Sequence, residues 1–357
     1  MAYKGVENNS SFSTEVALIA DENGRDVMLM LAKATYDIHE NNSLVLADEQ
    51  QEVCFEGEYF GDPGASSLKI APEANFEKLA TDVVMIGHAH SPSGQPVTEL
   101  DVGLKVGNLQ QHIKVFGDRY WQKRTTGKFV NWIMSKPESF TAMPLVYERA
   151  FGGKDLTPDD KKHYTFEPRN LIGTGIIAKN TVEEQVAMPN LENPKDLIKS
   201  ISDRPEPVGF GFIAPDWQPR LAYAGTYDKN WEKTRLPMLP KDFKKEFFNG
   251  AHPKLVANGF LEGTESVIVI NATQDRARLG FNLPGDKPVI KFKFEYAESQ
   301  PVDVKLDTVV INTDDMQVTL LWRAVQNVYN RVFEIEKVVF DNIVSNQIIP
   351  DDYEITV

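Results

Sequence analysis

The sequence has little of several features that define common protein classes. It contains one cysteine, Cys54, among 357 residues, so no internal disulfide can form and a reducing compartment is expected. The N-terminal stretch Met1–Asn8 lacks the apolar core of a signal peptide. No later run approaches the roughly 20 apolar residues that cross a bilayer. We therefore expect a cytoplasmic protein without membrane insertion.

The sequence also lacks an excess of positive charge. Lys and Arg number 38 against 52 Asp and Glu, which gives a net charge of −14. Such a chain repels phosphate backbones and gains nothing from counterion release, so we expect no nucleic-acid partner. Its 41% hydrophobic and 25% charged residues are typical of a folded globular protein, and its length is sufficient for about two cores.

Sequence motifs of common enzymes are missing as well. There is no phosphate-binding loop, no nucleophile elbow and no paired-histidine zinc helix. Gly173-Thr174-Gly175 fits part of a dinucleotide fingerprint, but no clean strand precedes it and no long helix follows it. We therefore expect no enzyme, no catalytic residues and no cofactor.

One pair of histidines is the nearest approach to a metal site. His88 and His90 are two residues apart, so on a strand both imidazoles would share a face. No third ligand follows from the sequence, and we expect no bound metal. The alternative is a metal- or carboxylate-dependent hydrolase that uses these histidines with a loop acid such as Asp62 or Asp118.

Apolar residues alternate with polar ones at both ends of the chain. Residues 97–106 and 290–296 show this period of two, and Asn23-Gly24 and Gly107-Asn108 are hairpin signals. The run 27–36 is apolar on both faces, which predicts a covered central strand. We expect a mainly β protein of two antiparallel sheet lobes, sandwich or barrel-like: an N-terminal lobe, 1–136, and a C-terminal β meander, 254–357.

The middle region, 137–253, differs from both ends. It holds thirteen of the 21 prolines, a density that regular strands do not tolerate. It is also too aromatic for a solvated linker. We expect long ordered loops packed on the sheets, with short helices near Asp196–Ser202 and Lys241–Phe248.

Aromatic and arginine side chains are concentrated in these loops and in one earlier loop. Such a mixture is typical of protein-binding hot spots, because rings and planar guanidinium groups offer area and directional hydrogen bonds. The same arginines could instead hold the loops on the sheets, and Trp217 could serve as a carbohydrate-stacking platform. The predicted partner-binding residues are Tyr59, Phe60, Arg149, Phe151, Arg169, Trp217, Arg220 and Tyr227.

Segments rich in glycine, aromatic residues and arginine recur in order along the chain. They are Gly61–Leu68, Gly87–Ala89, Phe116–Arg119, Pro144–Gly153, Glu167–Asn170, Pro189–Glu192, Trp217–Arg220 and Gly225–Asp228. Together they resemble a bacterial family known as a domain of unknown function that occurs in type VI secretion gene clusters. The resemblance covers roughly residues 10–340. It implies a non-catalytic adaptor or chaperone that binds a toxic effector through a PAAR-like domain and helps to load it onto the VgrG spike.

Overall fold

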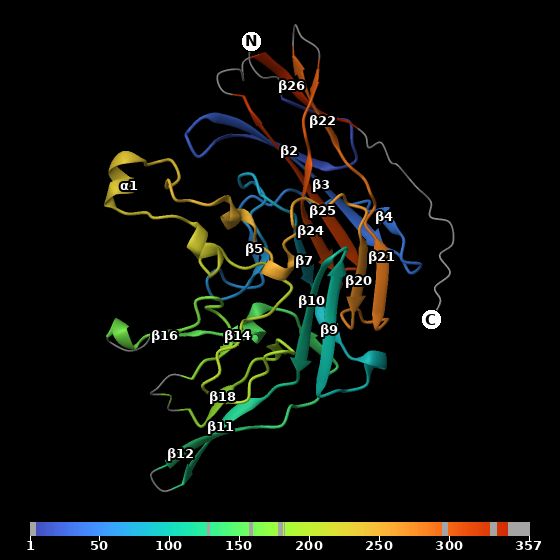
Figure 1. Ribbon diagram of the computed structural model, residues 1–357. Coiled ribbons are helices and arrows are strands. Elements are labelled where there is room, and N and C mark those ends of the chain that lie inside the picture. The colour runs from blue at the N-terminus through green and yellow to red at the C-terminus, as the bar shows by residue number, and fades with distance from the viewer. Residues whose placement is uncertain are drawn as a thin grey trace.

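The structure is a computed structural model. It describes residues 5–126, 129–156, 160–177, 181, 183–294, 299–328 and 334–341. Tyr296 and the chain after Asp341 therefore lie outside the described residues. Within them the protein is mainly β, as the sequence predicts, and its sheets are open rather than closed into a barrel (Figure 1).

The largest sheet combines strands from both ends of the sequence. Its order is β2-β3-β25-β24-β7, with β4 paired to β3. The Asn23-Gly24 hairpin is confirmed, because Ala20 of β2 pairs with Asp26 of β3. The central position of β3, covered on both faces, is confirmed too. The strands are β2 (Ser13–Ala20), β3 (Asp26–Ile38), β25 (Gln317–Asn327), β24 (Lys305–Asn312), β7 (Asp82–Ile86) and β4 (Leu44–Leu46).

A second sheet is built in the same way, in the order β19-β10-β9-β20-β21. The hairpin at Gly107-Asn108 joins β9 to β10, with Gly107 at a positive φ of 54° that suits the tight turn. Along β9, buried and more exposed residues alternate as the sequence predicts. The strands are β19 (Leu191–Glu192), β10 (Leu109–Phe116), β9 (Glu99–Val106), β20 (Ser266–Ile270) and β21 (Arg278–Asn282).

Smaller sheets complete the strand inventory. A four-stranded sheet contains β1 (Val6–Asn8), β26 (Ile335–Asp341), β22 (Val289–Phe294) and β23 (Gln300–Pro301). A three-stranded sheet contains β12 (Phe129–Met134), β11 (Tyr120–Thr126) and β18 (Gln185–Ala187). Two-stranded pairs are formed by β13 (Ala142–Pro144) with β8 (His88–His90), β14 (Phe151–Gly152) with β17 (Thr174–Gly175), β15 (Lys154–Asp155) with β16 (Thr165–Phe166), and β5 (Glu58–Tyr59) with β6 (Leu68–Ile70).

The strand pairing does not follow the sequence boundaries 1–136 and 254–357. The C-terminal strands expected to form one meander are divided among three sheets, all of which they share with N-terminal strands. One continuous core cluster includes Met30 of β3, Val102 of β9 and Phe340 of β26. Local alternation fixes which face of a strand is buried, whereas the choice of partner strand depends on contacts distant in sequence.

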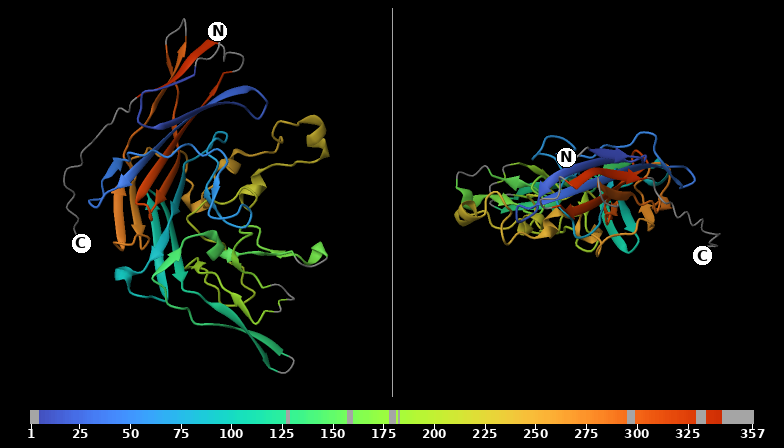
Figure 2. Two further views of the ribbon diagram at one scale, coloured as in Figure 1. Left: turned by 180° about the vertical axis from the view of Figure 1, so that it is seen from behind. Right: turned by 90° about the horizontal axis from the view of Figure 1, so that it is seen from above.

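The proline-rich middle forms ordered loops that cover one side of the sheets (Figures 1 and 2). Phe210 and Phe212 are buried in the core that the sheets share, and Phe210 accepts a backbone hydrogen bond from Met85 of β7. The prediction of a short helix near Asp196–Ser202 is wrong, because that segment forms turns and bends. The one expected near Lys241–Phe248 is confirmed only as a 3-10 turn, η5 (Lys245–Phe248).

Helical structure is sparse elsewhere too. One α-helix, α1, spans Lys229–Thr234 and is capped by Asp228, whose side chain accepts from the Trp231 backbone. Among the described helices, none combines the length and the apolar composition that crossing a membrane requires. The remaining 3-10 turns are η1 (Pro92–Gly94), η2 (Tyr147–Arg149), η3 (Lys161–His163), η4 (Arg220–Tyr223) and η6 (Pro253–Leu255).

A buried network of charged side chains, called here the charged network, lies on the largest sheet. It consists of Lys33, Glu73, Lys78, Asp82, Asp307 and Arg323. Lys78 Nζ lies 2.9 Å from Asp82 and 3.3 Å from Asp307. Arg323 Nε donates to Asp307 at 3.1 Å. Burial alone would raise the pKa of Asp307, but Arg323 and Lys78 outweigh it and keep that pKa below its usual value.

The charged network also attaches two loops to the sheet. Arg323 donates to the carbonyl of Glu73 at 2.6 Å, and Lys33 lies 2.9 Å from the Glu73 carboxylate. Asp82 accepts from the Asn249 side chain at 2.9 Å and from the Gly250 backbone at 2.8 Å. The loop after Glu73 and the segment before Gly250 are therefore held on the same buried charges.

The substitution Asp307→Asn should lower the free energy of unfolding by about 3–5 kcal/mol, because it leaves the buried Arg323 without its carboxylate and Lys78 with Asp82 alone. Denaturant titration of purified protein measures this change. Asp303→Asn is the matched control, since Asp303 pairs with Lys305 at 2.9 Å in an exposed position. It should cost less than about 1 kcal/mol. Equal, small losses in the two variants would contradict the role given to the charged network.

Candidate functional site

Many of the segments that carry the family resemblance meet at one place, called here the loop junction. Arg149 donates to Asp118 at 3.1 Å and to Asn190 at 3.0 Å. Glu148 accepts from the backbone and hydroxyl of Ser67 at 2.7 and 2.6 Å. These side chains surround a pocket of about 300 Å³. Their polar atoms are engaged with one another, so the junction fastens four distant segments together.

Two more arginines hold loop segments together through similar hydrogen bonds. Arg119 is buried, ion-paired with Glu192, and donates to the carbonyl of Pro189 at 2.9 Å. Arg169 donates through two nitrogens to Glu167 and reaches the carbonyl of Pro205 at 3.1 Å. At both positions the arginine therefore holds loop segments together, as the alternative interpretation of these arginines predicts.

Three of the predicted partner-binding residues are buried, so the surface proposed below does not include them. Trp217 is only 3% exposed and packs edge to face on Tyr147, with ring centroids 5.7 Å apart. This burial rules it out as a carbohydrate-stacking platform in this conformation. Phe151 lies in a core cluster with Trp121. Arg220 donates to the carbonyls of Ile213 and Phe247 at 2.6 and 3.0 Å. Burial lowers the pKa of Arg220 to about 10, so it stays protonated at neutral pH.

The other predicted residues differ in exposure and location. Tyr59 in β5 is half-buried against the core, and Phe60 beside it is exposed. Tyr227 is 53% exposed and packs on Trp231 of α1, with ring centroids 4.7 Å apart. Arg149 and Arg169 lie at the loop segments just described. The structure therefore does not bring the eight predicted residues together into one surface.

His88 and His90 both lie in the strand β8, so they are two residues apart on a strand. His88 Nδ1 lies 2.7 Å from Asp314 Oδ2, and the two imidazole centroids are 6.2 Å apart. Burial lowers the pKa of His90. Within the described residues, no group of three or more His, Cys, Asp and Glu side chains is placed to hold a metal ion.

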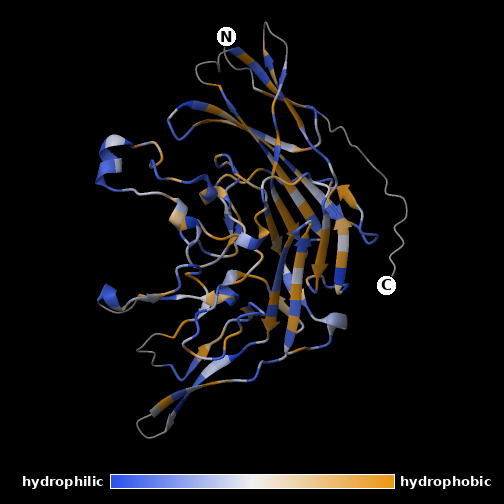
Figure 3. Ribbon diagram, in the orientation of Figure 1, coloured by the Kyte–Doolittle hydropathy of each residue, from blue (hydrophilic) through white to orange (hydrophobic). Residues whose placement is uncertain are grey.

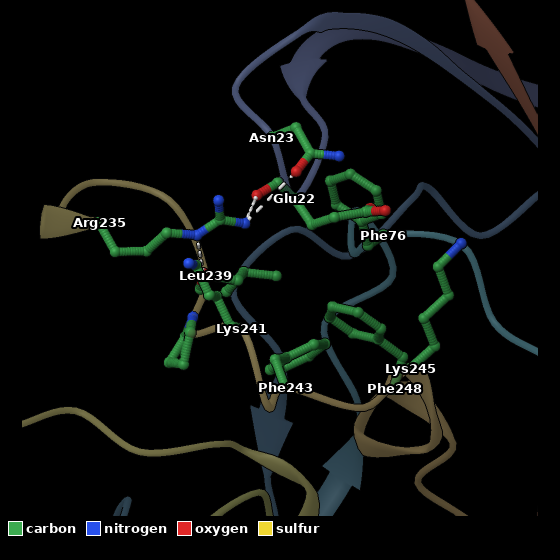
Figure 4. Close-up of a pocket in the computed structure, with 10 residues that line it drawn as sticks. Glu22, Asn23, Phe76, Arg235, Leu239, Lys241, Phe243, Lys245 and Phe248 are labelled. Atoms are coloured by element: carbon green, nitrogen blue, oxygen red, sulfur yellow. Dashed lines mark hydrogen bonds between the residues drawn. The ribbon is translucent and has the colours of Figure 1, made fainter. Parts of the chain in front are cut away.

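A second feature, called here the aromatic groove, lies between the β2–β3 turn, the loop after Glu73 and the segment that ends in η5 (Figure 4). Its volume is about 410 Å³. Phe248 stacks on Phe76 at 6.1 Å and lies 5.3 Å from Phe243, between ring centroids. The lining residues are Glu22, Asn23, Phe76, Arg235, Leu239, Pro240, Lys241, Phe243, Lys245 and Phe248.

The rim of the groove carries three cations, Arg235, Lys241 and Lys245, beside the carboxylates of Glu22 and Glu77. Arg235 donates to the backbone carbonyls of Glu22 at 2.6 Å and Leu239 at 2.8 Å. Carbonyl oxygens satisfy its hydrogen bonds without neutralising its charge. Lys245 pairs with Glu77 at 2.7 Å, a contact that raises the pKa of the lysine. Lys241 adds a further exposed cation at the rim.

Buried contacts hold each wall of the groove. Phe76 follows Asn75, whose carbonyl accepts from Arg323, and Phe248 precedes Asn249, so both rings are adjacent in sequence to bonds of the charged network. Arg220 Nε donates to the carbonyl of Phe247 at 3.0 Å. The groove is therefore a rigid, pre-formed depression rather than a gap between loose loops.

The sequence reasoning missed the groove residues. The signal that could have found them is the stretch Lys241–Phe248, which holds three phenylalanines and three lysines in eight residues. Phe76 carries no such signal, because it reaches the groove only through long-range packing of its loop.

Comparison with known families adds one finding. The family described as "Uncharacterized protein conserved in bacteria (DUF2169)" matches residues 23–323. The chain belongs to this family. The DUF2169 match spans the charged network up to Arg323, the loop junction and the aromatic groove, and it confirms the resemblance to a bacterial family of unknown function. No curated protein and no solved structure matches the chain.

In this DUF2169 protein, Arg220→Gln should lower the free energy of unfolding by about 2–4 kcal/mol, because two buried carbonyls lose their donor. Hydrogen exchange of the segment 243–250 should also become faster. Arg276→Gln is the control, since Arg276 donates to the carbonyl of Glu40 at 3.1 Å in an exposed setting. It should cost less than about 1 kcal/mol. Unchanged exchange in the Arg220 variant would contradict its assignment as a loop anchor.

Proposed function

We propose that this protein is a non-catalytic type VI secretion adaptor or chaperone. It binds an effector through the effector's PAAR-like domain and helps to load it onto the VgrG spike. The observation that carries the proposal is the aromatic groove, in which Phe76, Phe243 and Phe248 are half-buried around an open depression. The segments that resemble the type VI family supply the class of client.

Half-buried phenylalanine rings favour binding to a protein surface. Each ring still exposes apolar area that a partner can cover, and each is held by neighbouring rings, so little conformational entropy is lost on binding. The cations at the rim, Arg235 and Lys241, add directional contacts for acidic or carbonyl groups of the client. A rigid aromatic centre with a charged rim is the usual anatomy of a specific protein interface.

Exposed apolar side chains also lie on the segment around α1, which leads to the groove residues in sequence. Leu236 is 57% exposed and Tyr227 53% exposed, and both are close in sequence to groove residues. In Figure 1, α1, β16 and β12 project from the same side of the sheets. The other two projections also carry exposed apolar side chains: Leu156 and Phe166 near β16, and Val130 and Ile133 on β12.

These projections suit a chaperone role. A client enclosed between them would keep its own apolar face out of water until that face docks on the spike. The colouring in Figure 3 shows apolar and polar residues alternating along β9 of the second sheet, as expected for a strand with one covered face. Binding surface and stable core are thus carried by different parts of the chain.

The substitution Phe243→Ala should weaken capture of the client by about 2 kcal/mol, roughly 30-fold in dissociation constant, because it removes a ring from the centre of the groove. The test is co-expression with an effector that carries a PAAR-like domain and is encoded beside this gene, followed by affinity purification and titration of the complex.

Phe55→Ala is the matched control, since Phe55 is 51% exposed and does not line the groove. It should leave capture unchanged. If no complex forms with folded wild-type protein, the adaptor function is wrong. If a complex forms and both variants bind alike, the groove is not the interface.

A further inference from the structure

The hairpin of β11 and β12 carries an open sheet edge that lies outside the aromatic groove. β12 is the end strand of the three-stranded sheet β12-β11-β18. Among the described elements, β11 is the only one in extensive contact with it. In Figures 1 and 2 the hairpin projects at the end of the molecule opposite β22 and β26, and no other ribbon lies beyond β12.

The strand alternation shows which backbone groups of β12 point away from its sheet. Ser135, directly after β12, donates its backbone N–H to the carbonyl of Tyr120 at 2.9 Å, so this N–H faces β11. Residues at even spacing along a strand present their backbone groups to the same side, and the β11–β12 register has no shift. Val130, Trp132 and Met134 therefore direct their N–H and C=O groups outward. No described residue hydrogen-bonds to these groups.

The composition of β12 leaves this edge unprotected. Native edge strands are usually blunted by a charged side chain, a proline or a bulge. The strand Phe129–Met134 has none of these, and Val130 is 50% and Ile133 43% exposed. Trp132 and Met134 pack on a buried hydrophobic cluster, which holds the strand in place. The edge is therefore pre-formed and ready for a further strand.

Cations are concentrated around this edge. Residues 120–136 hold four Lys and Arg and no Asp or Glu, although the whole chain carries −14. Arg124 and Lys136 are exposed, and Lys123 Nζ lies 3.5 Å from the carbonyl of Thr181, which leaves the charge of the lysine intact. A second copy of the chain would bring the same cations to the edge, and like charges on paired strands destabilise the pair. The charge therefore favours an acidic occupant.

We propose that the edge of β12 binds an extended segment of a partner protein by strand addition, and that this segment is apolar at its centre and acidic at its ends. The outward groups of Val130, Trp132 and Met134 supply main-chain hydrogen bonds, as at other sheet edges that accept a peptide. The cations select the acidic ends. Charges farther away than about 10 Å are screened at 0.1 M salt, so the local cations outweigh the net charge of the chain. The site requires neither the effector nor the aromatic groove.

The probe is a fluorescent peptide in which Val and Thr alternate at the centre and two Glu residues stand at each end, titrated against the full chain. Binding should weaken as salt rises, and should be at least about tenfold weaker in the Arg124→Glu/Lys136→Glu double variant. Both side chains are exposed, so this variant should stay folded. Lys161→Glu/Lys162→Glu makes the same change in net charge elsewhere and should bind like the wild type.

Two further measurements distinguish strand addition from charge attraction alone. The amides of Val130, Trp132 and Met134, followed by NMR, should exchange more slowly when the peptide is bound. The same peptide N-methylated at its central residues keeps its charge but cannot pair, and it should not bind. The proposal is overturned if no peptide binds, if binding leaves the three amides unprotected, or if the N-methylated peptide binds as well. Protection of the same amides in a dimer of the free protein would assign the edge to a second copy and would equally contradict it.

Discussion

The charged network is the constraint on which the rest of the structure depends. Two buried carboxylates, Asp82 of β7 and Asp307 of β24, pair with Lys78 beneath the loops that cover the sheet. These contacts help to hold the loops in place. Removing such charges from water is costly, and only complete pairing offsets that cost. The network therefore tolerates few alternative arrangements. Because Phe76 follows Asn75 and Phe248 precedes Asn249, which both bond to the network, the buried charges position two of the rings of the aromatic groove.

The arginines show a division between scaffold and surface. Arg119, Arg220 and Arg323 are buried and donate mainly to backbone carbonyls and single carboxylates. Arg119 and Arg220 thereby fasten the proline-rich region, whose strands are short, and Arg323 fastens the loop at Glu73. Arg235 serves the groove, with its hydrogen bonds satisfied and its charge retained. Loops fastened in this way can present half-exposed rings without collapsing onto them. That rigidity favours recognition of a partner over internal packing.

Local patterns in the sequence predicted the parts of the fold that depend on neighbours in the chain. The turns at Asn23-Gly24 and Gly107-Asn108 and the doubly covered β3 follow from residue type and period. The sequence did not predict which strands pair, because β25 pairs with β3 although nearly the whole sequence separates them. For the site, composition pointed to the proline-rich middle, which supplies most of the groove residues. Trp217 and Phe151 look like hot-spot residues, yet they are buried in the core. Burial is decided by tertiary packing, which spacing alone does not encode.

The central claim is that the client covers the aromatic groove. A photo-crosslinking amino acid placed at Phe243 tests it most directly, in cells that produce both this protein and an effector with a PAAR-like domain. The account predicts a crosslinked adduct whose mass is the sum of the two proteins, and none from the same label at Phe55. Crosslinking from Phe55 but not from Phe243, in a complex that forms normally, would contradict it.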